Sequence, residues 1–445
     1  MPPFNRPTAM PLPSLLLSAP LLLLAPDSTV ASSAWLGLLP DGETKRRFVL
    51  DCTGCHVFDE TRALVQGRPR TRDEWAAAIS RMLEYAGPTS SFPVISRAAK
   101  PAELAAWLAG SLGNRRPAAK ADSAGVEGAV VTEYDLPEAQ DLPHDVAVDS
   151  AGSGVLITGM FTHVIYRLDL PTGKMTPVPI PVPKANPRAI ELDRAGDWWI
   201  LLGNPKLVAH RNRRTGAWRT FPIGAYPHSI ALTEGGAVWF NAHFSQAPEL
   251  LGSLDSRTGR ATTHAVPPHP TLATGDGGPV PYELRVAPDG TIWMSELQGN
   301  RMIAYRPGSD RFDTFTLPTP WSGPRRFDID ARGRLWIPAY SANALLQLDP
   351  ATGRFTEHRL PDGDAVPYVA RVDHANGMVW IGTSAADAVY RFDPRTARFT
   401  RFPLPTRGAI VRHITIDPAT HDVWLAYGAS PAKHPARIAR LRPPR

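Results

Sequence analysis

Five consecutive residues near the start of the chain have the types and spacing for covalent attachment of a haem: Cys52-Thr53-Gly54-Cys55-His56. In such a C-x-x-C-H motif each thiol can form a thioether with one edge of the porphyrin, and the adjacent imidazole is held where it can ligate iron. The alternatives are a chance match, a zinc site or a dithiol redox motif. A zinc site takes about four ligands, and the chain has no further cysteine. The motif predicts haem c bound through Cys52 and Cys55, with His56 as an axial ligand of the iron.

The second axial ligand can be approached by elimination. The next histidine after His56 is His144, and Met82 is the only methionine between the motif and residue 120. A methionine thioether raises the reduction potential of a haem relative to a second histidine. Three alternatives stay open: Met82 as core packing, a five-coordinate iron, and a ligand donated from elsewhere in the chain. We predict Met82 as the second axial ligand.

Residues 1–34 have the features of a secretory signal peptide. Arg6 precedes a largely apolar stretch at 12–25, and small residues at 28–34 offer a cleavage site. An uncleaved anchor is the alternative, but prolines at 13, 20 and 26 interrupt any membrane-spanning helix. No other stretch could span a membrane. Because haem is attached covalently outside the bacterial cytoplasm, the signal and the motif together predict a periplasmic protein.

The elements that would position the motif are predicted to be helical over residues 41–115. Thr71 begins a helix with two acidic residues in its first turn, and an apolar stripe from Trp75 to Leu83 follows at helical spacing. A further helix begins at Pro101. The motif followed by helices, one of them carrying Trp75 and Met82, resembles the short c-type cytochrome domains. Residues 116–129, small and polar, are predicted to be a linker.

The rest of the chain, 130–445, repeats at intervals of 40–54 residues. Each repeat has a residue pair entering a first strand, such as Pro143-His144, and six of the seven have a second strand led by tryptophan, such as Trp199. The last repeat stops after its third strand, and the missing outer strand is found at 131–137. Pairing of these two ends would close a ring of seven four-stranded sheets. The predicted fold is therefore multidomain: a small all-α c-type cytochrome domain followed by an all-β seven-bladed propeller.

The repeats resemble those of the streptogramin (virginiamycin B) lyases. The best copy reads Pro281-Tyr282-Glu283-Leu284, then an Asp-Gly turn, then Trp293-Met294-Ser295-Glu296. The resemblance covers about 130–445 and implies a metal-assisted elimination that opens an ester-containing ring, with Mg²⁺ bound in the propeller. The residues that the family pattern places in that site correspond here to His228, Tyr282 and Glu296. Tyr282 stands where the family has its histidine base, and Val280 stands where it has a glutamate.

Equivalent residues of the seven blades should meet at one mouth of the propeller channel. Arginine, histidine and tyrosine dominate this set, which suits a polar or anionic ligand. The alternative is that these residues only satisfy neighbouring loops. The predicted mouth residues are His144, Arg188, His228, Tyr282, Arg325, Tyr368 and His413.

Three functions follow as hypotheses. The first is periplasmic electron transfer, in which the propeller binds a ligand and the haem exchanges electrons with a redox partner protein or a small-molecule donor. The second is a streptogramin-type lyase with the cytochrome domain as an accessory, and the third is a pure binding module. A formal net charge of +6 with scattered arginines, and no recognisable nucleic-acid module, argues against a nucleic-acid partner.

Overall fold

The computed structural model describes residues 30–90, 93–95, 100–118, 125–149, 153–243, 249–272, 278–428 and 435–444. Most of the predicted signal peptide and part of the predicted linker lie outside these residues. The predicted boundary at residue 34 falls within a short helix whose Ser32 hydroxyl donates to the carbonyl oxygen of Phe58 at 2.8 Å. In the described part of the chain, no helix is long and apolar enough to cross a membrane.

The N-terminal segment is mainly helical. Its longest helix begins with the predicted cap, because the Thr71 hydroxyl accepts from the Glu74 amide and the Glu74 carboxylate accepts from the Thr71 amide. Two short strands, β1 (Leu64–Val65) and β2 (Arg68–Pro69), form a hairpin at Gln66-Gly67, where both residues have positive φ. The segment is therefore not all-α as predicted. Its helices are α1 (Ser32–Leu36), α2 (Glu43–Cys52), α3 (Glu60–Ala63), α4 (Arg72–Ala86) and α5 (Pro101–Leu112).

Seven four-stranded antiparallel sheets form the propeller, which confirms that part of the prediction. Blades 1 to 3 are β4 (Pro143–Asp149), β5 (Gly154–Gly159), β6 (Val164–Asp169) and β7 (Met175–Pro179); β8 (Pro187–Leu192), β9 (Trp198–Leu202), β10 (Leu207–Arg211) and β11 (Trp218–Pro222); β12 (Pro227–Leu232), β13 (Ala237–Ala242), β14 (Leu250–Asp255) and β15 (Ala261–Ala265). Blades 4 and 5 are β16 (Pro281–Val286), β17 (Ile292–Glu296), β18 (Arg301–Arg306) and β19 (Arg311–Thr316); β20 (Asp328–Ile329), β21 (Leu335–Ala339), β22 (Ala344–Asp349) and β23 (Arg354–Arg359).

Blade 6 is β24 (Pro367–Val372), β25 (Val379–Thr383), β26 (Ala388–Asp393) and β27 (Arg398–Pro403), and blade 7 is β28 (Val411–Ile416), β29 (Val423–Tyr427), β30 (Arg437–Arg442) and β3 (Val130–Asp135). The ring closes as predicted, because β3 supplies the outer strand of the last blade by pairing along its whole length with β30. Apolar side chains of neighbouring blades form the cores between sheets, with Trp336, Trp380 and Trp424 among the largest fully buried residues.

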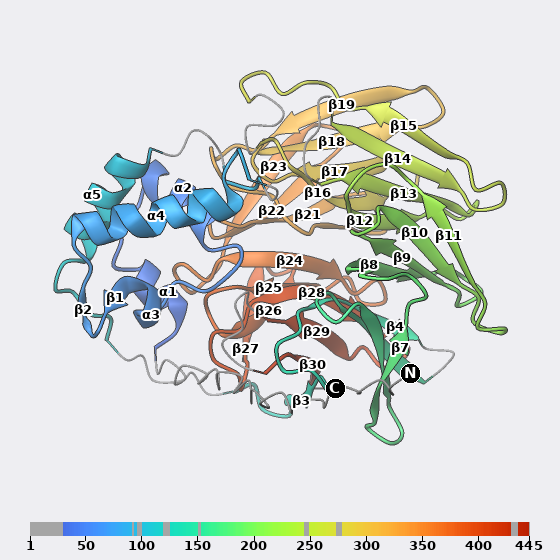
Figure 1. The fold of residues 1–445 in the computed structure, drawn as a ribbon, viewed down its shortest axis with the longest axis horizontal. Helices are drawn as coiled ribbons and strands as arrows, with labels where there is room; N and C mark the ends of the chain where they lie inside the picture. Colours follow the sequence, from blue (N-terminus) through green and yellow to red (C-terminus); the bar gives the residue numbers. More distant parts are fainter. Residues whose placement is uncertain are drawn as a thin grey trace, which may run out of the picture.

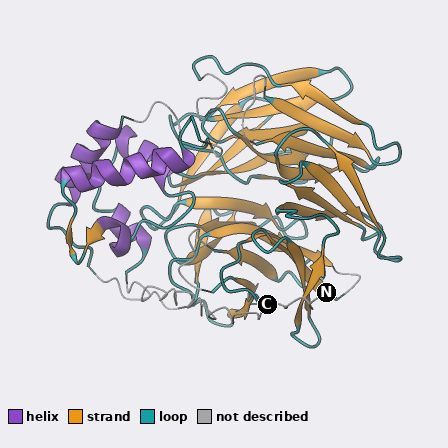
Figure 2. Cartoon of the chain, in the orientation of Figure 1, coloured by secondary structure: helices purple, strands orange, loops and turns teal. Residues whose placement is uncertain are grey.

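The helical segment is packed against one side of the propeller (Figures 1 and 2). Most of its buried apolar side chains belong to one cluster with propeller residues, so the two parts share a core. At the edge of this contact the Lys45 ammonium lies 2.8 Å from an Asp364 carboxylate oxygen, and the Trp321 indole donates to Glu43 at 3.0 Å. Gly323, with φ of +63°, leaves no room for a Cβ atom beside Leu50. The helices therefore form a fixed cap on the propeller.

Candidate functional site: two cavities joined by one loop

β-Bulges direct one residue from six of the seven blades toward the mouth of the channel. In six blades the pairing of the first two strands shifts register directly after the first residue of the strand, as between Pro187 and Ala189. A bulge of this kind re-aims the side chain that follows. These six side chains, together with Arg325, which follows the isolated bridge between Pro324 and Ala339 in blade 5, line one cavity of about 200 Å³, called the mouth cavity. The seven residues are His144, Arg188, His228, Tyr282, Arg325, Tyr368 and Arg412.

Six of the seven predicted mouth residues therefore lie together, and His413 does not. Blade 7 begins with Val411 where the other blades have proline, so the bulged position is Arg412. His413 lies outside the mouth cavity, with its Nε2 at 3.1 Å from Arg371 and 3.8 Å from an Asp145 carboxylate oxygen. Counting one residue from the position of the proline, rather than choosing the histidine, would have identified Arg412.

The C-x-x-C-H loop closes the mouth cavity from the helical side. Gly54 and Cys55 line the cavity together with Asp51. The Arg412 guanidinium donates to the Cys55 carbonyl oxygen at 3.1 Å, and the Tyr340 hydroxyl donates to the Thr53 carbonyl oxygen at 2.8 Å. A Cβ atom on Gly54 would lie only 2.6 Å from Arg325, so glycine is required for this approach. The propeller thus holds the loop by its backbone.

A buried cluster of arginine and tyrosine forms one wall of the mouth cavity. The Arg325 guanidinium lies over the rings of Tyr340 and Tyr368, at 3.9 and 4.6 Å from their centroids, and donates to the Tyr282 hydroxyl at 3.0 Å. The Tyr282 and Tyr368 hydroxyls are hydrogen-bonded to each other. Burial alone would raise the pKa of Tyr368, but Arg412 and Arg325 outweigh it and hold that pKa below its usual value.

Three histidines, His144, His228 and His243, line the mouth cavity as neutral rings, and two of them are packed against Tyr282. His228 Nδ1 donates to the Tyr282 carbonyl oxygen at 2.7 Å, and His243 Nδ1 donates to the Pro281 carbonyl oxygen at 2.9 Å. A carbonyl only accepts, so Nε2 of His228 and of His243 carries no proton when the ring is neutral. Burial lowers the pKa of His144 to about 3, and burial with nearby positive charge holds the pKa of the other two well below the usual value. These rings can accept hydrogen bonds or protons from a ligand.

Glu296 does not take part in the mouth cavity. It is fully buried, and Arg301 binds both of its carboxylate oxygens, with 2.8 Å between Nη2 and Oε1. Val280, at the second family position, is a buried apolar side chain. Among the described residues lining the mouth cavity Asp51 is the only carboxylate. Mg²⁺ prefers carboxylate and other oxygen ligands, so these residues do not fit a magnesium site of the lyase type.

A second cavity, also of about 200 Å³, lies within the helical segment and is called the helical cavity. Cys52, His56 and Met82 line it, together with apolar side chains that include Trp75 and Leu108. His56 Nδ1 lies 3.2 Å from the Val57 carbonyl oxygen.

The helical cavity has several of the groups that a haem c needs, although Cys55, the second thiol of the motif, lines the mouth cavity instead. One thiol, an imidazole and a thioether line it, the apolar walls suit a porphyrin, and three arginines could bind its two carboxylates. The Nε atom of Arg62 is buried without a partner among the described residues, so one donor is available to an acidic group. The three arginines are Arg62, Arg70 and Arg81.

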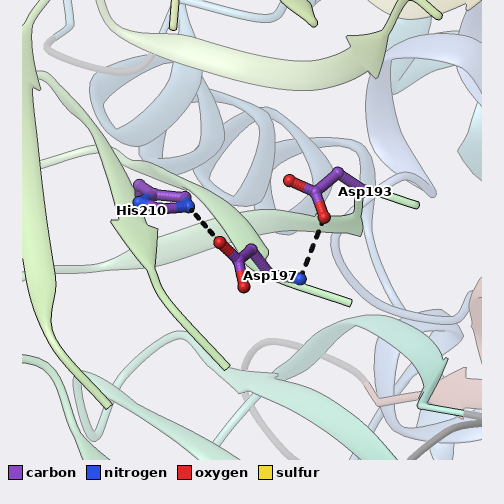
Figure 3. A group of neighbouring side chains, drawn as sticks. All are labelled: Asp193, Asp197 and His210. Atoms are coloured by element: carbon purple, nitrogen blue, oxygen red, sulfur yellow. Dashed lines mark hydrogen bonds and ion pairs between the residues drawn. The ribbon is translucent and has the colours of Figure 1, made fainter. Parts of the chain in front are cut away.

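A third group, Asp193, Asp197 and His210, lies close enough to suggest a metal site, and Figure 3 shows the three side chains. Their atoms are already bound, however. Asp193 accepts from the Asp197 amide at 3.0 Å and from the Trp199 indole at 3.0 Å, and Asp197 accepts from His210 Nε2 at 3.0 Å. Asp330 and Trp336 repeat the Asp-to-indole bond in another blade. The group is a turn of the repeat rather than a metal centre.

Comparison with known proteins supports the propeller fold. The model of the virginiamycin B lyase family matches residues 269–439. A virginiamycin B lyase from Staphylococcus aureus superposes with a TM-score of 0.61 and 20% identity, covering 71% of this chain and 99% of that chain. A catalytically inactive variant of that lyase, crystallised with quinupristin, gives the same TM-score at 19% identity, again covering 71% and 99%.

A different propeller, YCF48 bound to D1 peptide, has a TM-score of 0.54 and 12% identity, covering 70% of this chain and 94% of that chain. No curated protein matches the chain by sequence. At these identities the similarity establishes a virginiamycin B lyase-like seven-bladed propeller, and the activity has to be argued from the site itself.

Proposed function

We propose that the protein binds a small polar or anionic molecule in the mouth cavity and exchanges electrons with it through a haem c held in the helical cavity. One observation carries this proposal: the loop from Cys52 to His56 lines both cavities. Cys55 lines the mouth cavity, whereas Cys52 and His56 line the helical cavity. A haem bound there supplies one-electron transfer. The wall between ligand and haem would then be the loop itself.

The chain's own residues bind and enclose the ligand in this proposal. His228 and His243 are neutral acceptors that can orient it, and the arginines of the mouth cavity attract a negative group. The C-x-x-C-H loop covers part of the mouth, and Arg412 and Tyr340 hold the loop there through its backbone. Export to the periplasm and a redox partner protein or small-molecule donor complete the proposal, because the haem must be attached there and must return its electrons.

The first experiment tests the haem. The full chain is expressed in an exporting host that attaches c-type haem, and the purified protein is assayed for a pyridine haemochrome after acid-acetone extraction. We expect covalent haem in the wild type and none in the double variant Cys52→Ser/Cys55→Ser. Thr53→Ser is the matched control, because it keeps the motif and a hydroxyl facing Tyr340. A wild-type protein without covalent haem would refute this part of the proposal.

Coupling between the two cavities is tested by redox titration. Candidate donors are added to the oxidised holoprotein, and reduction is followed in the absorption bands of the haem. His228→Gln should change the rate of reduction by a small donor, because His228 lines the mouth cavity and lies outside the helical cavity. Equal rates for the variant and the wild type with every donor would contradict coupling through the mouth.

A lyase is the second candidate function. Its supporting observation is the neutral His228 imidazole in the mouth cavity of a propeller that is similar in fold to the S. aureus lyase. Such a base could abstract a proton from an ester-containing ring. Quinupristin is incubated with the wild type, with and without Mg²⁺, and the linear product is sought by mass spectrometry. His228→Ala should abolish turnover, and an inactive wild type removes this candidate.

A further inference from the structure

Three buried arginines of the mouth cavity carry positive charge without a carboxylate partner. Arg188, Arg325 and Arg412 are 3, 3 and 6% exposed. Within the described ranges, none of the three forms an ion pair with an aspartate or glutamate. Arg188 contacts the Met160 sulfur at 3.6 Å, and Arg412 donates to backbone carbonyl oxygens. Their neighbours therefore satisfy some hydrogen bonds but leave the charge unbalanced.

Elsewhere in the propeller buried arginines are paired with acids. Arg326 donates to an Asp145 carboxylate oxygen at 2.7 Å, and Arg371 donates to Glu283 at 2.8 Å. A buried charge without a partner costs several kcal/mol, so the pairing of these two is the expected arrangement. The three arginines of the mouth cavity depart from this pattern, and all of them line one space.

Donor groups in the mouth cavity are also unused. The Nε atoms of Arg188 and Arg325 are buried and have no hydrogen-bond partner in the described structure. The nearby carboxylate of Asp51 accepts from the Gln298 amide at 2.7 Å. The histidines of the cavity are neutral and add no charge of their own. A ligand that fits must therefore bring acceptors and negative charge.

We propose that the mouth cavity binds a small oxyanion with at least two negative charges. This inference shares with the proposed function only the mouth cavity as the binding site. The oxyanion balances the charge of Arg188, Arg325 and Arg412 and accepts from their guanidinium N–H groups. Because Arg412 binds the Cys55 carbonyl oxygen and Arg325 lies against Gly54, the anion is held beside the C-x-x-C-H loop. Inorganic oxyanions and short dicarboxylates share this chemistry.

Isothermal titration of the full-length holoprotein tests the inference. The probes are inorganic phosphate, sulfate and malonate, with malonamide as the uncharged counterpart of malonate. At least one dianion should bind, and malonamide should not. Arg188→Gln should weaken that binding by roughly 10- to 100-fold, as expected for the loss of a charged hydrogen bond. The control is Arg194→Gln, whose side chain is 79% exposed, and it should bind as the wild type does.

Thermal unfolding provides a readout that a merely structural arginine would not give. Malonate should raise the melting temperature of the wild type, and at the same concentration it should raise that of Arg188→Gln less. Without anion, Arg188→Gln should melt at the same temperature as the wild type or higher, because it removes an unbalanced buried charge. A lower melting temperature without anion, together with unchanged affinity, would overturn the inference.

The same titration on Cys52→Ser/Cys55→Ser separates this inference from the haem proposal. Anion binding in a protein that never acquires haem supports the inference even if the haem proposal fails. A haem-loaded wild type that binds none of the three anions overturns the inference and leaves the haem proposal standing. Binding only in the haem-free variant also overturns it, because the carboxylates of the haem would then be filling the mouth cavity.

Discussion

Replacing Asp387 with asparagine should stabilise the protein at neutral pH. Asp387 lies in the turn between β25 and β26 and is 2% exposed. One carboxylate oxygen accepts from the Gly408 amide at 2.8 Å, and the other has no hydrogen bond among the described residues. The nearest positive group is the Arg407 guanidinium, at 3.7 Å. The loop of this turn supports the helical cap, because the Ser33 amide donates to the Ala385 carbonyl oxygen.

The magnitude follows from the pKa of this carboxyl group. Burial raises the pKa of Asp387 from its ordinary value of 3.8 to about 6, against the opposing effect of Arg407. Between these two values the folded protein binds the proton more tightly than the unfolded chain does. The free energy of unfolding therefore falls as the pH rises through this window. Because one pKa unit corresponds to 1.36 kcal/mol, the total loss is about 3 kcal/mol.

Asparagine keeps the accepting oxygen, tolerates the φ of +47° at this position and carries no charge. We expect the free energy of unfolding of Asp387→Asn to exceed that of the wild type by about 1–3 kcal/mol at pH 7.5. Urea denaturation at pH 7.5 and at pH 4.5 measures this, and the difference should shrink at the lower pH. Asp393→Asn, in an exposed turn where backbone hydrogen bonds lower the pKa, should show no such gain. An Asp387→Asn variant no more stable than the wild type at pH 7.5 would refute the reasoning.

Three further predictions concern the cap and the site. Met82→Ala should shift the spectrum of the reduced haem and lower its potential, whereas unchanged values in a redox titration mean that Met82 only packs against the wall. Tyr340→Phe removes two buried hydrogen bonds to Thr53 and should lower the free energy of unfolding, measured in urea, by about 1–2 kcal/mol. The control is Tyr134→Phe, which should not lower it, because no hydrogen bond of the Tyr134 hydroxyl is seen in the described structure. Glu296→Gln leaves Arg301 without its buried charged partner and should lower the free energy of unfolding by about 3–5 kcal/mol, both with and without Mg²⁺. If Glu296 instead bound a metal, the loss of stability would depend on Mg²⁺.

The propeller could be predicted from the sequence because its markers are local and repeated. A proline before the first strand and a tryptophan at the second recur in most blades, and a period of this length specifies four short strands. The number of blades and the closing strand followed from counting. The mouth residues followed from the same register, except in blade 7, where Val411 replaces the proline and the bulge places Arg412 rather than His413 at the mouth.

Contacts between distant parts of the chain could not be predicted in this way. Even the short-range pairing of Glu296 with Arg301, five positions apart across a hairpin, was missed, because the repeat pattern marked Glu296 only as a generic position of the repeat. The salt bridge from Lys45 to Asp364 joins residues 319 positions apart. No periodicity reports such a contact, so the position of the cap on the mouth, and the shared wall of the two cavities, came only from the structure.

The closure of the ring between β3 and β30 sets an order of events during synthesis. The C-x-x-C-H loop leaves the ribosome long before its partner Arg412, which lies 358 positions beyond Gly54. Contacts of such long range form late in folding. Cys52 and Cys55 are therefore most accessible while the propeller is still open. Once the ring has closed, the propeller covers the loop, so the haem attachment that we propose would have to come before the propeller is complete.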